Sequence, residues 1–149
     1  MIRFFSEDIS FSLSGRRRFV ASWLRAVAAS RGYALGDLNY IFCSDPYLLS
    51  INRQFLGHDY YTDIITFDNS ADYALEKGRE GVSGDIYISI DTVRANGLEY
   101  GEGFERELLR VIAHGLLHLT GCDDVTSDLQ AEMTAAENAA LALYDKMAL

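Results

Sequence analysis

Residues 84–90, Gly-Asp-Ile-Tyr-Ile-Ser-Ile, decide the fold class of this 149-residue chain. Their isoleucines alternate with Tyr87 and Ser89, which is the period-two pattern of a strand with one buried face. Residues 62–67 form a second segment rich in β-branched side chains. Residues 69–83 between them are polar and contain two glycines. We therefore predict two neighbouring antiparallel strands joined by a long loop, with the three isoleucines of 84–90 on the core face.

The rest of the chain alternates strand and helix patterns around this pair. Further strands are predicted at 2–5, as an edge strand, and at 38–43. Helices are predicted at 14–31, 45–57, 91–99, 104–120 and 127–144. Asp45, Asp91 and Ser127 are the expected caps, the last in a capping box with Gln130. This order predicts an α+β fold, a single domain over residues 1–149 with a mixed β-sheet of about four strands packed with helices.

Composition is that of an ordinary globular domain, with 49% hydrophobic and 23% charged residues. No apolar run approaches the ~18 residues that span a bilayer, so no membrane partner is expected. Glu7 and Asp8 come too early for a signal peptide. Cys43 and Cys122 are expected to be reduced, and the chain is expected to be cytoplasmic.

The net charge of −9 argues against a general nucleic-acid binder, but the charge is unevenly distributed. Residues 1–31 carry six arginines against two acidic residues, whereas the remainder carries 7 basic and 20 acidic residues. Arg16, Arg17 and Arg18 open the first predicted helix. That helix either holds a phosphate backbone locally or presents an ordinary solvated face.

Residues 114–124, HGLLHLTGCDD, contain the candidate metal ligands. His114 and His118 are four residues apart, so on a helix both imidazoles stand on one face. Gly121 then ends the helix, and Asp124 can return a carboxylate to the same ion. Two imidazoles and a carboxylate leave a fourth zinc position open, which is the arrangement of catalytic sites. The segment thus predicts a metal-binding helix near the C-terminus.

Two alternatives stay open from spacing alone. Histidines four residues apart are also common as ordinary core or surface residues without a metal. The chain has only three histidines, and two of them have this spacing, which favours a metal site. Glu107 shares the helical stripe of His114 but lies two turns away, too far to be a ligand. It either supports the cleft or is a solvated glutamate, and the solvated interpretation is preferred. A metallopeptidase would need glutamate where Gly115 stands, so that class is disfavoured.

The segment also resembles the signature H-G-x-L-H-L-x-G-x-D-H of the YbeY family of bacterial endoribonucleases that mature ribosomal RNA. Similarity to that family continues upstream. Residues 51–67 resemble its L-N…T-D/N-V-L-S-F block, residues 83–89 its G-D-I-x-I-S strand, and residues 107–114 its E-x-x-x-L/V-x-x-H segment. The resemblance covers residues 40–145, with the blocks in the family's order.

The resemblance implies one zinc ion per chain, held in the family by three histidines. His114 and His118 match two of them, and the third position falls on Asp124. Aspartate is a zinc-competent ligand, but its negative charge should make bound water less acidic. Asp123 and Cys122 are rival third ligands at neighbouring positions.

A second departure concerns the substrate. The family has a functionally important arginine where this chain has Leu56. Arg53, one helical turn earlier, and His58, two residues later, are candidates to compensate. Asp63 and Asp85 stand in matching blocks and are candidates to orient the cleft. No catalytic residue beyond the metal ligands is identified.

The resemblance implies a metal-dependent (zinc) endoribonuclease that hydrolyses single-stranded RNA in rRNA processing and ribosome maturation. An rRNA precursor is then the expected partner, with the ribosome or ribosomal proteins as further candidates. The alternative is a non-catalytic ribosome-assembly or RNA-binding factor whose metal is structural, which Leu56 and the net charge favour. A third is a metal-dependent hydrolase of another substrate, because a fold does not settle chemistry.

Overall fold

The sheet of this protein has four strands in the order β1-β2-β4-β3, in a computed structural model that describes residues 1–149. The strands are β1 (Ile2–Ser6), β2 (Leu35–Cys43), β3 (Ile64–Asp68) and β4 (Val82–Ser89). β1, β2 and β4 run parallel, and β3 is antiparallel to β4. The predicted mixed sheet, its antiparallel pair and the edge position of the first strand are therefore confirmed.

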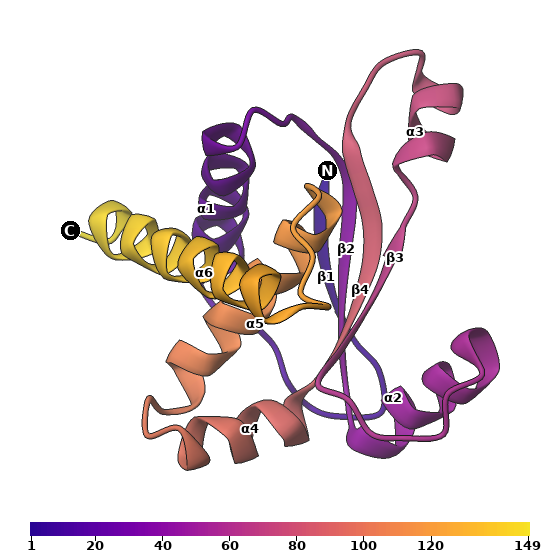
Figure 1. The fold of residues 1–149 in the computed structure, drawn as a ribbon, viewed down its shortest axis with the longest axis vertical. Coiled ribbons are helices and arrows are strands. Elements are labelled where there is room, and N and C mark those ends of the chain that lie inside the picture. The colour runs from indigo at the N-terminus through magenta and orange to yellow at the C-terminus, as the bar shows by residue number, and fades with distance from the viewer.

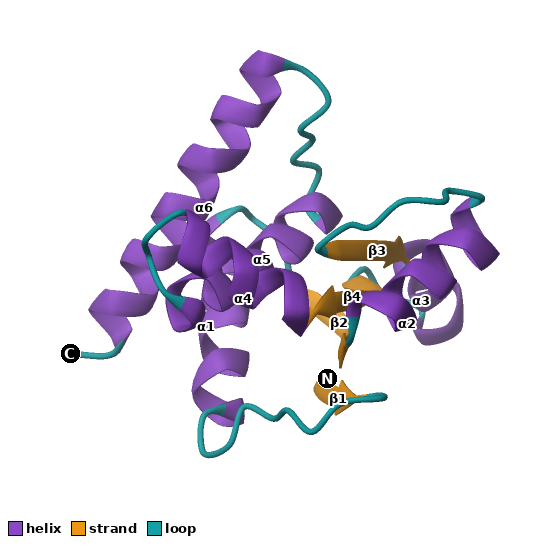
Figure 2. Cartoon of the chain, turned by 90° about the horizontal axis from the view of Figure 1, so that it is seen from below, coloured by secondary structure: helices purple, strands orange, loops and turns teal.

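Helices cover both faces of the sheet (Figures 1 and 2). They are α1 (Arg17–Ser30), α2 (Asp45–Ile51), a π-helical continuation η1 (Asn52–Leu56), α3 (Ser70–Lys77), α4 (Ile90–Glu99), α5 (Phe104–Leu119) and α6 (Ser127–Met147). In Figure 2, α1, α4, α5 and α6 lie on one side of the strands, and α2 and α3 lie on the other. None of these helices is both long enough and apolar enough to cross a membrane.

The main core lies between the sheet and the larger helical layer. Tyr40 and Phe42 of β2 and Ile86 and Ile88 of β4 point into it, as strand alternation requires. Their partners come chiefly from α1 and α5, and they include Trp23, Leu24, Leu108, Ile112 and Leu116. Ile86 and Ile88 confirm the predicted core face. Ile90 is also buried but opens α4 instead of ending the strand.

Three predicted helix caps are wrong. The observed caps are Ser44 for α2, Ser89 for α4 and Thr126 for α6, in place of Asp45, Asp91 and Ser127. Each hydroxyl accepts a hydrogen bond from a backbone N–H three residues later. Two of the aspartates serve tertiary contacts instead: Asp45 accepts from the Thr92 hydroxyl at 2.6 Å, and Asp91 accepts from the Asp45 backbone N–H at 2.9 Å. These contacts tie α2 to α4.

Residues 69–83, predicted as a loop, contain α3. This helix ends at Gly78 in the left-handed conformation (φ 69°), and Tyr73 is its one buried residue. With a single buried residue, α3 lacks the repeated buried positions by which a helix is recognised in a sequence. The other differences are shifts at element ends, and the largest are of three residues. α1 starts three residues later than predicted, after Gly15 at φ 75°, β2 starts three residues earlier, and α6 ends three residues later, at Met147.

Helix α5, which carries His114 and His118, lies directly against the sheet at Gly115. A Cβ atom there would stand 2.8 Å from Cγ2 of Ile86 and 3.1 Å from Cδ1 of Ile64. A side chain at this position would therefore force Ile86, Ile64 or α5 itself to shift. The close approach places His114 and His118 beside the β3 edge of the sheet.

Candidate metal centre

His114 and His118 stand one turn apart on α5, as predicted, with their ring centroids 4.5 Å apart and their planes at 82°. Both side chains are partly exposed, at 19% and 28%. They are held by a helix whose inner face is fully buried, so the backbone that carries them is fixed by core packing.

Asp124 returns to the histidines because the chain reverses after α5. Gly121 adopts a positive φ of 95°, and the Cys122 backbone N–H donates to the Leu117 carbonyl at 3.0 Å. Oδ2 of Asp124 then lies 3.6 Å from Nε2 of His114 and 3.5 Å from Nε2 of His118. The three donor atoms all lie within 4.8 Å of one another.

The two nitrogen–oxygen separations are close to those of a zinc site. Donor atoms arranged tetrahedrally at ~2.0–2.1 Å from zinc are about 3.3 Å from one another. The two measured nitrogen–oxygen distances exceed that value by only a few tenths of an ångström. Two neutral imidazoles and one carboxylate are also a donor set that zinc accepts.

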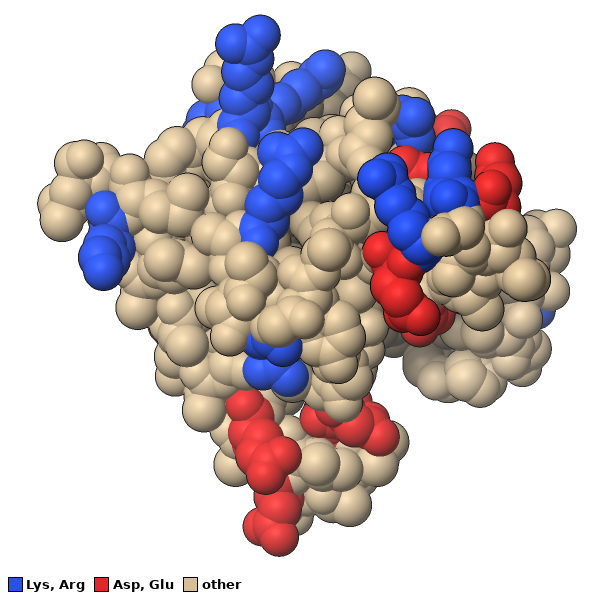
Figure 3. Space-filling model, turned by 90° about the horizontal axis from the view of Figure 1, so that it is seen from above, with Lys and Arg blue, Asp and Glu red and all other residues tan.

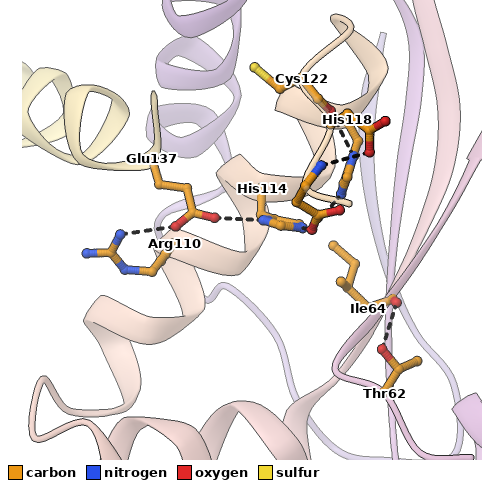
Figure 4. Close-up of polar contacts among 9 residues, drawn as sticks. Thr62, Ile64, Arg110, His114, His118, Cys122 and Glu137 are labelled. Atoms are coloured by element: carbon orange, nitrogen blue, oxygen red, sulfur yellow. Dashed lines mark hydrogen bonds and ion pairs between the residues drawn. The ribbon is translucent and has the colours of Figure 1, made fainter. Parts of the chain in front are cut away.

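The second nitrogen of each imidazole has its own hydrogen-bond partner (Figure 4). Nδ1 of His118 lies 2.9 Å from the backbone carbonyl of Cys122, and Nδ1 of His114 lies 2.6 Å from Oε2 of Glu137. A carbonyl oxygen only accepts, so Nδ1 of His118 donates to it, and Nε2 is the nitrogen left to face an ion. Both histidines are thus oriented to present Nε2 to an ion beside Asp124.

The rival ligands do not converge on this point. Cys122 contributes its backbone carbonyl to His118, and Figure 4 shows its sulfur directed away from that ring. Asp123 is exposed, and its Oδ1 accepts from the Asp124 backbone N–H at 2.7 Å. The group of donors that the structure brings together is therefore His114, His118 and Asp124.

Glu137 is the important residue that the sequence interpretation missed. It lies on α6, is only 8% exposed, and links His114 to Arg110, whose Nη1 is 3.2 Å from Oε1 (Figure 4). A signal was present, because Glu137 shares a helical stripe with the buried Met133 and Leu141. A charged side chain on the apolar face of a helix indicates a buried partner.

Two further carboxyl groups near the candidate site, those of Glu107 and Asp63, are removed from solvent, and this changes their pKa values. Glu107 is 4% exposed, so the preferred interpretation of a solvated glutamate is wrong. Burial, and then the charge of Asp63, raise the pKa of Glu107 to about 7. Burial likewise raises the pKa of Asp63. Burial alone would lower the pKa of His114, but the hydrogen bond and charge of Glu137, with Asp63 and Asp124, outweigh it and raise that pKa.

A cleft of about 530 Å³ opens beside the candidate ligands His118 and Asp124. His118 and Asp124 line one side of it, and the opposite side comes from η1, the loop after it and β3. His58 and Leu56 both line this cleft. The His58 ring stacks on Tyr60 at 5.0 Å, and its Nδ1 lies 2.9 Å from the Tyr60 hydroxyl.

The other candidate substrate residues lie elsewhere. Arg53 is exposed and forms an ion pair with Asp59. Asp63 is half-buried near His114, behind the cleft lining. Asp85 lies on the sheet face opposite α5, where it accepts from the Asn39 side chain at 3.0 Å. The structure thus brings His58 to the cleft, and it does not bring Arg53 or Asp85 there.

Replacing Glu137 with glutamine is expected to weaken metal binding by roughly 10–100-fold while the fold is retained. The amide keeps a hydrogen-bond acceptor for Nδ1 of His114 but removes the negative charge that makes the imidazole a stronger donor. Competition with a chromophoric chelator measures this affinity. Glu102→Gln is the matched control, because Glu102 also pairs with Arg110, at 3.6 Å, without touching His114. Equal affinities for the two variants would contradict the role of Glu137.

Comparison with known proteins extends the match to nearly the whole chain. A family model described as Endoribonuclease YbeY matches residues 2–145. The endoribonuclease YbeY of Cytophaga hutchinsonii is 50% identical over 142 residues, which are 95% of this chain and 94% of that protein. The endoribonuclease YbeY of Porphyromonas gingivalis is 44% identical over 145 residues, 97% of this chain and 91% of that protein.

A solved structure shares the fold. The solution structure of protein TM1509 of Thermotoga maritima superposes with a TM-score of 0.65 at 28% identity, over 97% of this chain and 89% of that one. The similarity therefore includes the sheet, the helix that carries both histidines, and the segment that carries Asp124.

Proposed function

This chain belongs to the YbeY family of endoribonucleases, and on that premise we propose that it is a metal-dependent endoribonuclease acting on single-stranded RNA in rRNA processing and ribosome maturation. Residues 1–149 would form one hydrolase domain, with an rRNA precursor as its partner. The observation that carries this proposal is the convergence of two oriented histidines and Asp124 at the edge of an open cleft.

We assign one zinc ion per chain to His114, His118 and Asp124. Zinc at such a site supplies Lewis-acid chemistry, which polarises a phosphoryl oxygen and makes water a stronger acid. Three protein donors leave a coordination position free, and two of them, His118 and Asp124, line the cleft. Both features support a catalytic over a structural ion.

The chain's own residues are assigned to holding and orienting. Glu137 and the Cys122 carbonyl fix the two imidazoles, so Nε2 of each needs no reorientation when the ion binds. His58 lines the cleft and stacks on Tyr60, so we assign it the contact with a substrate phosphate that Leu56 cannot make. Asp63 contributes negative charge behind His114.

Removal of the metal is expected to abolish cleavage of a circular single-stranded RNA, and zinc is expected to restore it. A circular substrate has no ends, so cutting it establishes internal cleavage. A duplex RNA of the same sequence should resist cleavage. Electrophoresis of the products measures cleavage, and circular dichroism of the metal-free protein verifies that it stays folded. RNA that stays intact with the zinc-loaded protein would favour the non-catalytic RNA-binding alternative instead.

A further inference from the structure

A second groove lies on the other side of the molecule, between the edge strand β1 and helix α1. Its volume is about 630 Å³, and the residues of β1 and α1 that line it include Arg3, Phe5, Arg17, Arg18 and Arg25. No acidic residue contributes to this lining. We call it the arginine groove. β1 and β3 are the opposite edges of the sheet, so the arginine groove and the metal cleft flank it from two sides.

The arginines of this groove differ from all others in the chain. Arg3, Arg17, Arg18 and Arg25 are exposed, and none forms an ion pair, a hydrogen bond or a cation–π contact. Every other arginine has a partner: Arg16, Arg53, Arg106 and Arg110 pair with carboxylates, Arg31 with Thr120, Arg79 with Tyr73, and Arg94 with the ring of Phe104. Unneutralised positive charge is therefore concentrated in one groove of an otherwise acidic protein.

The placement of these arginines also opposes local stability. Arg17 and Arg18 lie in the first turn of α1, where the positive end of the helix dipole disfavours cations. The helix has no acidic residue in that turn to offset them. Figure 3 shows Lys and Arg side chains projecting at the upper left of the view with no Asp or Glu drawn beside them. An anionic ligand would relieve this accumulation of like charge.

The groove offers more than charge. Phe5 is 45% exposed and, like Arg3, turns to the sheet face away from α1, so its ring is open to a base that follows the β1 edge of the groove. β1 has a neighbour on one side only. The Met1 carbonyl accepts from the Leu38 N–H and the Glu7 N–H donates to the Phe42 carbonyl, so odd-numbered residues of this parallel strand turn towards β2. The N–H groups of Ile2 and Phe4 therefore point outwards and can donate to phosphate oxygens.

We propose that the arginine groove binds the phosphate backbone of single-stranded RNA and holds the substrate at a distance from the metal cleft. The inference rests on the proposed function for the identity of the ligand. Positive charge along a groove, an exposed aromatic ring and free backbone N–H groups are together what single-stranded nucleic acid recognition uses. Arg16, which opens the same helix, faces Glu105 and is not part of the groove.

The test compares two triple variants of the full-length chain that lose the same charge. Arg17→Gln/Arg18→Gln/Arg25→Gln removes three positive charges from the arginine groove. Lys77→Gln/Arg79→Gln/Lys146→Gln removes three positive charges elsewhere on the surface. Binding of a labelled single-stranded RNA of about 20 nucleotides, longer than the ~4–16-nucleotide sites of such grooves, is measured after chelation of metal. The groove variant should bind roughly tenfold more weakly, and the slope of log K against log salt should fall by about 2, at ~0.7 per lost contact.

A kinetic arm separates this inference from the proposed function. With zinc-loaded protein, the groove variant should show a raised KM for the long RNA and an unchanged kcat, whereas the control variant should match the parent. Equal affinity and equal salt slope for both triple variants would overturn the groove, even if the parent cleaves RNA. Weaker binding by the groove variant, with no cleavage by the parent, would keep the groove and refute the nuclease. Thermal unfolding of both variants verifies that the fold is intact.

Discussion

Alanine in place of His114 is expected to remove the metal and to lower RNA cleavage by roughly a thousandfold or more, about 4 kcal/mol in the activation free energy. His114 supplies one of only three protein donors, and the ring is held by Glu137 at 2.6 Å. Its loss leaves His118 and Asp124, which are too few to retain zinc against competition from solvent. Metal content by elemental analysis and cleavage rate are measured on the same preparation.

The third donor is tested by a matched pair of neighbouring substitutions. Asp124→Asn removes the carboxylate that lies 3.5 Å from His118 and 3.6 Å from His114, whereas Asp123→Asn makes the same change at an exposed side chain beside it. Only Asp124→Asn should lose the ion. Loss of metal from Asp123→Asn with retention in Asp124→Asn would reassign the ligand, and retention in His114→Ala would refute the site.

The second large effect concerns stability and pH. The free energy of unfolding of the metal-free protein should fall by roughly 2–3 kcal/mol between pH 5 and pH 8 through Glu107 alone. Burial and the charge of Asp63 raise the pKa of Glu107 from 4.5 to about 7 in the folded protein. Between these values the folded state holds a proton that the unfolded state has released, so rising pH favours unfolding.

Glutamine at position 107 should remove the share of this pH dependence that Glu107 contributes. Glu107→Gln keeps the shape of the side chain and cannot ionise, so its stability should match the parent at pH 5 and exceed it at pH 8. Urea unfolding at the two pH values measures the difference. Glu105→Gln, on the same helix but 63% exposed and paired with Arg16 at the surface, is the control and should change little. An identical decline with pH in Glu107→Gln and the parent would contradict the assignment.

The parts of the site that could be predicted are those encoded within a few residues of each other. His114 and His118 share a helical face because of their spacing, and Gly121 permits the reversal that returns Asp124. Glu137 reaches His114 from another helix 23 residues later, and nothing in local spacing specifies that contact. Its burial among apolar neighbours was visible in the sequence, but its partner depended on how α6 docks on α5.

The same distinction explains the fold. The alternation in β4 predicted its buried face because the period of a strand is local. The cap of α2 was misplaced because Ser44 and Asp45 are both good caps, and a contact with Thr92 on α4 decided between them. Helix α3 was missed because one buried residue, Tyr73, cannot establish a period. Glu107 was assigned to solvent because helical spacing gives a face, but not what covers it.

The contact of Gly115 with the sheet limits what this scaffold can become. In metallopeptidases of the H-E-x-x-H type, a glutamate directly after the first histidine serves as the base. Here that position meets Ile86 and Ile64, with no room for even a Cβ atom. A glutamate would force Ile86, Ile64 or α5 itself to shift and place its carboxylate in an apolar layer. A single Gly115→Glu substitution would therefore be expected to lower stability without placing a base beside the ion.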